Sequence, residues 1–382
     1  MKFFSTSFKQ WATMPEKRQS GPLWYMAIFI AAALLALWAG RGQWGLSSLS
    51  FSYAHQVLLF SSGQGISTYL HWPPGYAVLA LPLHLFGMAP LQALWLLSIL
   101  AFALLNVLLF NLTARFSNRI FASLAVVMTV LHPVLLLWAN QVMTEMVFTA
   151  ALLWAFYRSV ITVERTSLDW KSALWTGLAL AAPYWFRFIG IMVTVTGLGF
   201  LAVWAWLHKK KIWFAIASFS ALFCLPVLAR NMLYMNTLSG HGLGNRPRAD
   251  FANALSDTLS ELAKAWLPLP QSLQAADWYR SIGFLLLLVL LLFLVWNRRN
   301  LWRLLLPAFP LLYMLGFAYA YSHARIDPLN ERFVMPMVAL LNVGLILSWH
   351  GWFSSGRKRF PKTSRILAVA PIMMVTFIGL KG

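Results

Sequence analysis

Residues 41–76 read RGQWGLSSLSFSYAHQVLLFSSGQGISTYLHWPPGY, and this stretch determines how the rest of the chain is interpreted. It follows an apolar run at 23–40, which is close to the ~20 residues that cross a bilayer. The stretch itself is polar and interrupted by glycine, which disfavours a second crossing. It ends in Trp72-Pro73-Pro74-Gly75-Tyr76, where the prolines favour a rigid turn and a helix start. We therefore interpret 41–89 as an outer loop that covers an active site.

The composition indicates a membrane protein. Of the 382 residues, 60% are hydrophobic and only 10% are charged, whereas a soluble domain carries about 25% charged residues. The single cysteine, Cys224, excludes an intramolecular disulfide and a zinc site built from several cysteines. The net charge of +20 would suit a nucleic-acid partner, but the positions of the charges argue against one.

The apolar runs predict an all-α polytopic protein with about eleven transmembrane helices. We expect a basic cytoplasmic tail at 1–22 and a single transmembrane domain at 23–380, with outer loops at 41–89 and 230–281. Residues 73–88 reach only ~24 Å as a helix, so they should form a short helix that does not cross. The predicted spans are 23–40, 90–112, 121–139, 146–163, 173–186, 190–208, 212–229, 282–296, 304–321, 334–350 and 366–380.

The charges predict the orientation of the chain. In this topology, 20 of the 30 Lys and Arg residues lie in the cytoplasmic tail and loops, and most of the 10 acidic residues lie outside. This is the positive-inside pattern, and we expect a bacterial inner-membrane protein with a cytoplasmic N-terminus. The basic loops then face an anionic leaflet, which explains the charge without nucleic acid.

The second outer loop contains a predicted amphipathic helix. Apolar residues recur with helical spacing in LSDTLSELAKAWLPLP, at Leu255, Leu259, Leu262 and Trp266. We expect this helix to lie on the membrane surface.

Glu145 is the strongest candidate for chemistry, because an acid at the membrane end of an apolar span is costly and often functional. A stabilising charge at a helix N-terminus is the simpler interpretation. His71 could serve as a base or contact phosphate, although a lone histidine is more often structural. Arginines at outer span ends suit phosphate, or they extend to the interface for structural reasons. They are Arg187, Arg230, Arg325 and Arg332, and Glu331 can pair with the last.

Several short motifs occur in a definite order between residues 23 and 350. They are Tyr53-Ala54-His55 with Gly63-Gln64-Gly65, Trp72-Pro73-Pro74-Gly75-Tyr76, His132-Pro133 with Thr144-Glu145, Gly177 through Arg187, Arg230-Asn231, and Glu331-Arg332-Phe333 with Pro336. In these motifs the chain resembles the GT-C glycosyltransferases, in the branch with aminoarabinose transferases, dolichyl-phosphate-mannose-type protein mannosyltransferases and RgtA/B/C/D-like proteins.

The resemblance implies an inverting transferase that moves a sugar from a polyprenyl-phosphate donor to a lipid, glycan or protein acceptor at the outer face. Such a reaction needs a carboxylate to take a proton, cations for the phosphate charge and a groove for the lipid. We expect Glu145 as this carboxylate, with His71 as the alternative base, and the outer arginines as the cations. Tyr53, Trp72, Tyr76 and Glu331 should contact substrate beside them.

One departure from the family pattern leaves alternatives open. The family places an Asp in the first loop, whereas residues 41–76 contain no Asp or Glu. Glu145 is the best remaining carboxylate, as a base or as a group that orients the acceptor or a divalent metal; Asp327 and Glu331 are fallbacks. The alternatives are a non-catalytic relative that binds a polyprenyl phosphate or assists a glycan-assembly enzyme, and a transporter or flippase. A transporter should show paired halves with broken helices, which the sequence lacks.

Overall fold

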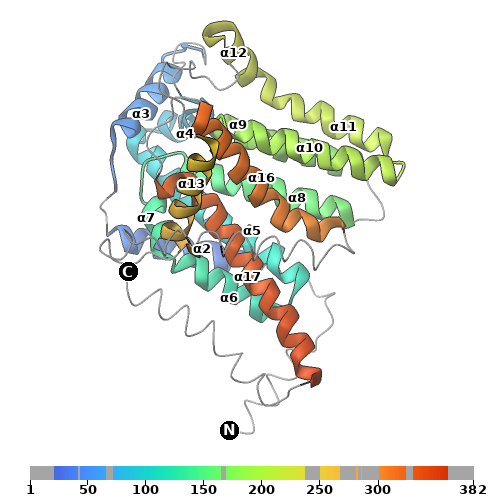
Figure 1. Ribbon diagram of the computed structural model, residues 1–382. Coiled ribbons are helices and arrows are strands. Elements are labelled where there is room, and N and C mark those ends of the chain that lie inside the picture. Colours follow the sequence, from blue (N-terminus) through green and yellow to red (C-terminus); the bar gives the residue numbers. More distant parts are fainter. Residues whose placement is uncertain are drawn as a thin grey trace.

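The protein is a bundle of helices in the computed structural model (Figure 1). Within the part of the chain that the structure describes there is no strand, only an isolated bridge between Gly45 and Gln141. The described residues are 21–41, 44–65, 72–164, 169–236, 250–266, 281–282, 285, 301–323 and 330–359.

The helices follow the predicted apolar runs. Five segments are long and apolar enough to cross a membrane among the described residues, namely α2, α5, α8, α10 and the α11–α12 segment. The expected span at 366–380 and all but two residues of the expected span at 282–296 lie outside the described residues, so the total of about eleven stays a prediction. The elements are α2 (Pro22–Gly40), α3 (Ser48–Ser61), α4 (Gly75–Leu85), α5 (Pro90–Phe116), α6 (Arg119–Val130), α7 (Pro133–Ala139), α8 (Glu145–Glu164), α9 (Trp170–Phe186), α10 (Gly190–Leu207), α11 (Lys211–Ala221), η1 (Leu222–Cys224), α12 (Leu225–Met235), α13 (Phe251–Trp266), α16 (Leu301–His323) and α17 (Glu331–Arg359).

The predicted span 121–139 is two helices, not one. Helices α6 and α7 meet at a 65° bend. The break falls at His132-Pro133, where His132 has extended backbone and Pro133 occupies the first turn of α7. Proline has no N–H to continue the hydrogen bonds of α6, so the chain turns there.

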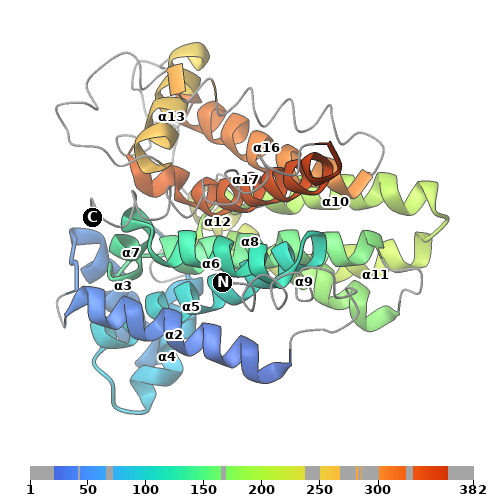
Figure 2. The same cartoon turned by 90° about the horizontal axis from the view of Figure 1, so that it is seen from below.

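Four of the helices that are not among the long apolar spans lie at one end of the bundle. Both views place α3, α4, α7 and α13 at this end and the α10–α11 turn at the other (Figures 1 and 2). Helix α4 has 11 residues, so it is too short to cross, as the sequence indicated. Helix α13 buries Leu259, Leu262 and Trp266 and packs against α16 and α17. It is therefore amphipathic as predicted, with its apolar face on the bundle.

Helix α9 lies at the centre of one side, where it packs against α8, α10 and α11. Its contact with α11 requires Gly177, because a Cβ there would fall on the carbonyl oxygen of Ala217 and on Ser220 Oγ. Gly199, on α10, has no neighbouring atom within 4 Å of the same position. These two glycines therefore differ only in what surrounds them.

We predict that Gly177→Ala and Gly199→Ala change thermal stability in opposite directions. Overpacking of the α9–α11 contact should cost about 1–3 kcal/mol, whereas alanine in an open helical position gains roughly 0.5–1 kcal/mol. Melting of the purified protein in detergent measures both. Equal shifts in the two variants would contradict the close approach of α9 to α11.

Candidate active site

Glu145 is the first residue of α8, and its side chain is only 3% exposed. Its Oε1 accepts a hydrogen bond from Nη1 of Arg187 at 3.1 Å. Its Oε2 is buried and has no hydrogen-bond partner among the described residues. A buried carboxylate oxygen costs free energy unless something pairs with it. Glu145 therefore presents one oxygen that is held and one that is available to a ligand.

Arg187 follows the last residue of α9, with extended backbone. Its guanidinium carbon lies 4.8 Å from the ring centroid of Phe333, on α17, and 5.8 Å from that of Phe148, on α8. An aromatic face attracts a cation most strongly where water is excluded. Helices α8, α9 and α17 therefore meet at this ion pair.

The segment just before Glu145 is bound to the first outer loop. Gly45 N–H donates to the carbonyl of Asn140 at 3.0 Å, and Val142 N–H donates to the carbonyl of Gly45 at 3.1 Å. Ser50 Oγ donates to the carbonyl of Val142 at 2.9 Å. These backbone bonds fix the start of α8, so the first loop sets the position of the Glu145 carboxylate without supplying an acid itself.

Tyr53 lies on α3, in the first loop, and is buried. Its phenol hydrogen-bonds the side chain of Thr144, and it interacts electrostatically with Glu145, Arg187 and Arg332. Burial, together with the negative charge of Glu145, raises the pKa of Tyr53 well above its usual value. Tyr53 is therefore a neutral hydroxyl beside the carboxylate at any physiological pH.

Tyr76 supports the site from behind. Its ring packs edge-on against Tyr53 at a centroid distance of 5.4 Å. Its hydroxyl donates to the carbonyl of Leu94 at 2.7 Å and shares a 2.7 Å hydrogen bond with Ser98 Oγ. The hydroxyl is thus occupied within the protein, which favours a structural role over the expected contact with substrate.

Trp72 and Arg230 are joined across the outer end of the bundle. The carbonyl of Trp72 accepts from Arg230 Nη2 at 3.0 Å and from Gln56 Nε2 at 3.2 Å. A Cβ at Gly75 would lie 2.5 Å from the carbonyl oxygen of Trp185. Glycine therefore lets the Trp-Pro-Pro-Gly-Tyr turn sit against α9. Arg230 anchors this turn, and its proposed contact with donor phosphate stays a prediction.

Arg332 is the second residue of α17 and is 9% exposed. Its guanidinium carbon lies 4.5 Å from the ring centroid of Phe333, the ring that Arg187 also contacts. Two guanidinium groups on one ring repel each other unless negative charge lies between or beside them. Glu145, which binds Arg187 at 3.1 Å, supplies negative charge beside this pair.

The remaining expected site residues lie at the edge of the described region or outside it. Glu331 begins α17 and is half-buried. His71, Arg325 and the fallback Asp327 lie outside the described residues. The sequence analysis assigned no role to Thr144, Phe148 or Phe333. Thr144 and Phe333 did occur in the motifs Thr144-Glu145 and Glu331-Arg332-Phe333, whereas Phe148 occurred in none. In the described ranges no three His, Cys, Asp or Glu side chains gather as metal ligands, so the divalent metal stays an expectation.

Comparisons with known proteins support the motif analysis. Residues 71–229 match the family model described as dolichyl-phosphate-mannose-protein mannosyltransferase. No curated protein matches the sequence.

Solved structures are similar in fold. ArnT from Cupriavidus metallidurans in the apo state has a TM-score of 0.58 and 15% identity, with 86% of this chain and 60% of that chain covered. The same protein bound to undecaprenyl phosphate has a TM-score of 0.59 and 12% identity, with 94% and 72% covered. The Archaeoglobus fulgidus oligosaccharyltransferase, tethered with an acceptor peptide, has a TM-score of 0.55 and 11% identity, with 94% and 55% covered.

The chain therefore spans 60% of the length of apo ArnT. At these identities the likeness is one of fold, and it agrees with the motif order and the family match over 71–229. The chain is a multi-pass membrane protein with the fold of the GT-C glycosyltransferases.

Proposed function

We propose that this protein is an inverting membrane glycosyltransferase that moves a sugar from a polyprenyl-phosphate donor to a hydroxyl group. The buried Glu145 carboxylate carries the proposal, because Oε1 is held by Arg187 while Oε2 lacks a partner among the described residues. The family match, which includes both residues, supports it. So does ArnT, a similar structure that binds undecaprenyl phosphate.

The reaction needs one proton acceptor and one site for negative charge. The acceptor oxygen attacks the anomeric carbon, and the bond from that carbon to the phosphate oxygen of the lipid breaks. The hydroxyl proton goes to Glu145 Oε2, and the electron pair of the broken bond leaves on the phosphate. Arg187 orients the carboxylate through its hydrogen bond to Oε1, and Arg332 stabilises the phosphate. Tyr53, which stays protonated, donates a hydrogen bond at the same site.

The proposed orientation places Glu145 at the outer face of a bacterial inner membrane, with the N-terminus in the cytoplasm. The charge distribution along the sequence supports it, since lysines and arginines concentrate in the loops assigned to the cytoplasm. A sugar lipid in the outer leaflet would then reach the site from the side of the bundle.

Glu145→Gln should abolish sugar transfer, because general-base catalysis typically contributes 10²–10⁴-fold. The measurement is complementation of a deletion strain, with mass spectrometry of envelope lipids, polysaccharides and proteins to find the sugar that the wild-type gene restores. Glu261→Gln is the matched control, since Glu261 pairs with Lys264 within α13 and not with Arg187. Full activity in Glu145→Gln would exclude the carboxylate and favour His71, which His71→Ala then tests. If deletion and wild-type strains carry the same glycans, the protein is a non-catalytic lipid-binding relative.

Arg187→Gln should lower the free energy of unfolding by roughly 3–5 kcal/mol, because it leaves the buried Glu145 charge without its partner. The double variant Glu145→Gln/Arg187→Gln should recover most of this loss, since neither charge remains. Thermal melting of the single and double variants gives the coupling. Additive losses would show that the pair contributes nothing beyond its separate side chains.

Arg332→Ala should weaken binding of undecaprenyl phosphate by about 10- to 100-fold, because a charge-assisted hydrogen bond is lost. Native mass spectrometry or a lipid-dependent melting shift measures this on purified protein. Glu145→Gln should bind the same lipid as well as wild type does. Unchanged binding in Arg332→Ala would move the phosphate away from α17.

A further inference from the structure

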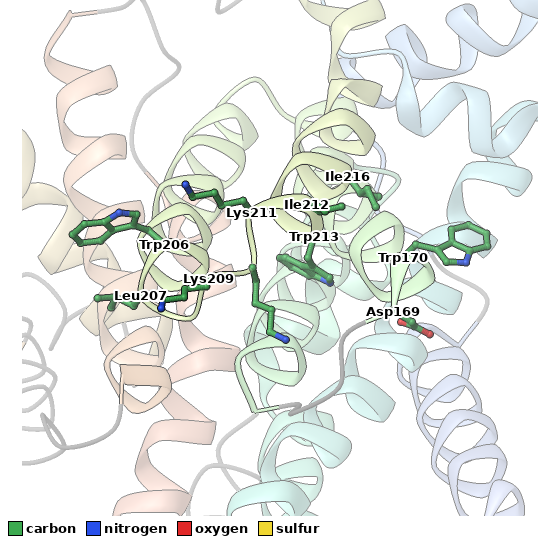
Figure 3. A pocket seen from close by; sticks show the side chains of 10 residues that line it. Asp169, Trp170, Trp206, Leu207, Lys209, Lys211, Ile212, Trp213 and Ile216 are labelled. Atoms are coloured by element: carbon green, nitrogen blue, oxygen red, sulfur yellow. The ribbon is translucent and has the colours of Figure 1, made fainter.

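A second site lies at the end of the bundle opposite Glu145. Helix α8 starts at Glu145 and runs for 20 residues, about 30 Å, which is about the thickness of the hydrocarbon core. Beyond its far end, an open pocket of about 1090 Å³ lies between the start of α9, the end of α10 and the start of α11 (Figure 3). The pocket shares no residue with the Glu145 site, and the α10–α11 turn lies at the opposite end of the bundle from α3 and α4 (Figures 1 and 2).

Three consecutive lysines, Lys209, Lys210 and Lys211, line this pocket. They come from the tight turn between α10 and α11, where Figure 3 labels Lys209 and Lys211. Within the described residues none of the three forms an ion pair. One acid, Asp169, also lines the pocket, and its Oδ1 accepts from Ser172 N–H at 2.8 Å as the N-cap of α9. The lining therefore keeps an excess of positive charge.

The turn that presents these lysines is held by backbone hydrogen bonds. Lys210 N–H donates to the carbonyl of Ala205 at 2.8 Å, and Lys209 N–H donates to that of Trp206 at 3.3 Å. Lys209 has φ of 55°, the left-handed conformation that glycine usually fills at a helix end. Lysine at this strained position keeps a positive charge where glycine would be the easier residue.

The walls of the pocket are apolar and outward-facing. Ile212 is 81% exposed, Trp206 is 72% exposed and Leu207 is 56% exposed. Large apolar side chains at this exposure in a membrane protein contact lipid chains, and tryptophan favours the level of the headgroups. The pocket thus combines cations with an apolar surface for acyl chains. An anionic lipid uses both features, whereas a soluble anion uses only the cations.

The start of α11 lies at the same place. Helix α11 starts at Lys211, and its N-cap residue makes no side-chain capping bond. The N–H groups of its first turn are therefore oriented for an anion. An anion at this position would also gain from the positive end of the helix dipole.

We infer that this pocket binds the headgroup of an anionic phospholipid from the leaflet opposite Glu145. The phosphate lies among the three lysines and the start of α11, and the acyl chains run along Trp206 and Ile212. The site is separate from the proposed transfer reaction and does not depend on it. The pocket recognises a negative charge together with acyl chains, so zwitterionic lipids and soluble phosphates bind weakly.

The test uses the full-length protein in detergent, titrated with phosphatidylglycerol, phosphatidylcholine or glycerol phosphate and followed by native mass spectrometry. Wild type should retain phosphatidylglycerol at least about tenfold more tightly than phosphatidylcholine. Lys209→Gln/Lys210→Gln/Lys211→Gln should lose this preference, and the matching triple arginine variant should keep it. An unchanged preference in the triple glutamine variant would overturn the inference.

Lys171→Gln is the matched control, because Lys171 lies in the first turn of α9, at the same end of the bundle, but does not line the pocket. If phosphatidylglycerol is attracted only diffusely to a basic surface, the loss of any one lysine should weaken its binding roughly fivefold. If the pocket is a specific site, Lys211→Gln should weaken that binding about tenfold and Lys171→Gln less than about twofold. Equal losses would mean diffuse attraction only, and equal competition by glycerol phosphate would mean a soluble anion; either result would overturn the lipid site. An unchanged melting temperature of the triple glutamine variant shows that the rest of the protein is intact.

Discussion

The ion pair between Glu145 and Arg187 is the constraint that organises the outer end of the bundle. Removing two charges from water costs several kcal/mol for each ion, and the protein recovers part of that cost through one hydrogen bond at 3.1 Å and the aromatic faces of Phe148 and Phe333. Those contacts require α8, α9 and α17 to end at the same place. A residual cost remains in the second carboxylate oxygen, and a substrate hydroxyl would relieve it.

The first loop acts through its backbone and hydroxyl groups. The family pattern has an acid in this loop, but here Gly45 and Ser50 hydrogen-bond the segment that precedes Glu145. The loop therefore positions the carboxylate at the start of α8. The carboxylate of Glu145 then lies at the start of α8, where the positive end of the helix dipole and the guanidinium of Arg187 both face its negative charge.

Local patterns predicted the elements of this fold better than they predicted the partners of single side chains. The lengths of the apolar runs predicted the bounds of most helices to within a few residues, and they predicted that α4 is short. The spacing of apolar residues predicted the amphipathic α13. The sequence also pointed to Glu145 and Arg187 separately. It did not predict that Tyr76 uses its hydroxyl on Leu94 and Ser98, or that Arg230 holds a carbonyl 158 residues away. Such bonds depend on which helices pack together, and no spacing along the chain encodes that.

Proline and glycine explain both the success and the failure at the helix ends. In the Trp-Pro-Pro-Gly-Tyr turn the prolines mark a helix start that the structure contains, and Gly75 permits contact with the backbone of α9. At His132-Pro133 the same chemistry lies inside a run apolar enough to look continuous, and the run length prevailed in the prediction. The 65° bend there directs α7 toward the segment that leads into Glu145. The bend between α6 and α7, which run length and hydropathy did not reveal, thus helps to bring the Glu145 carboxylate to the end of the bundle where the first loop can hold it.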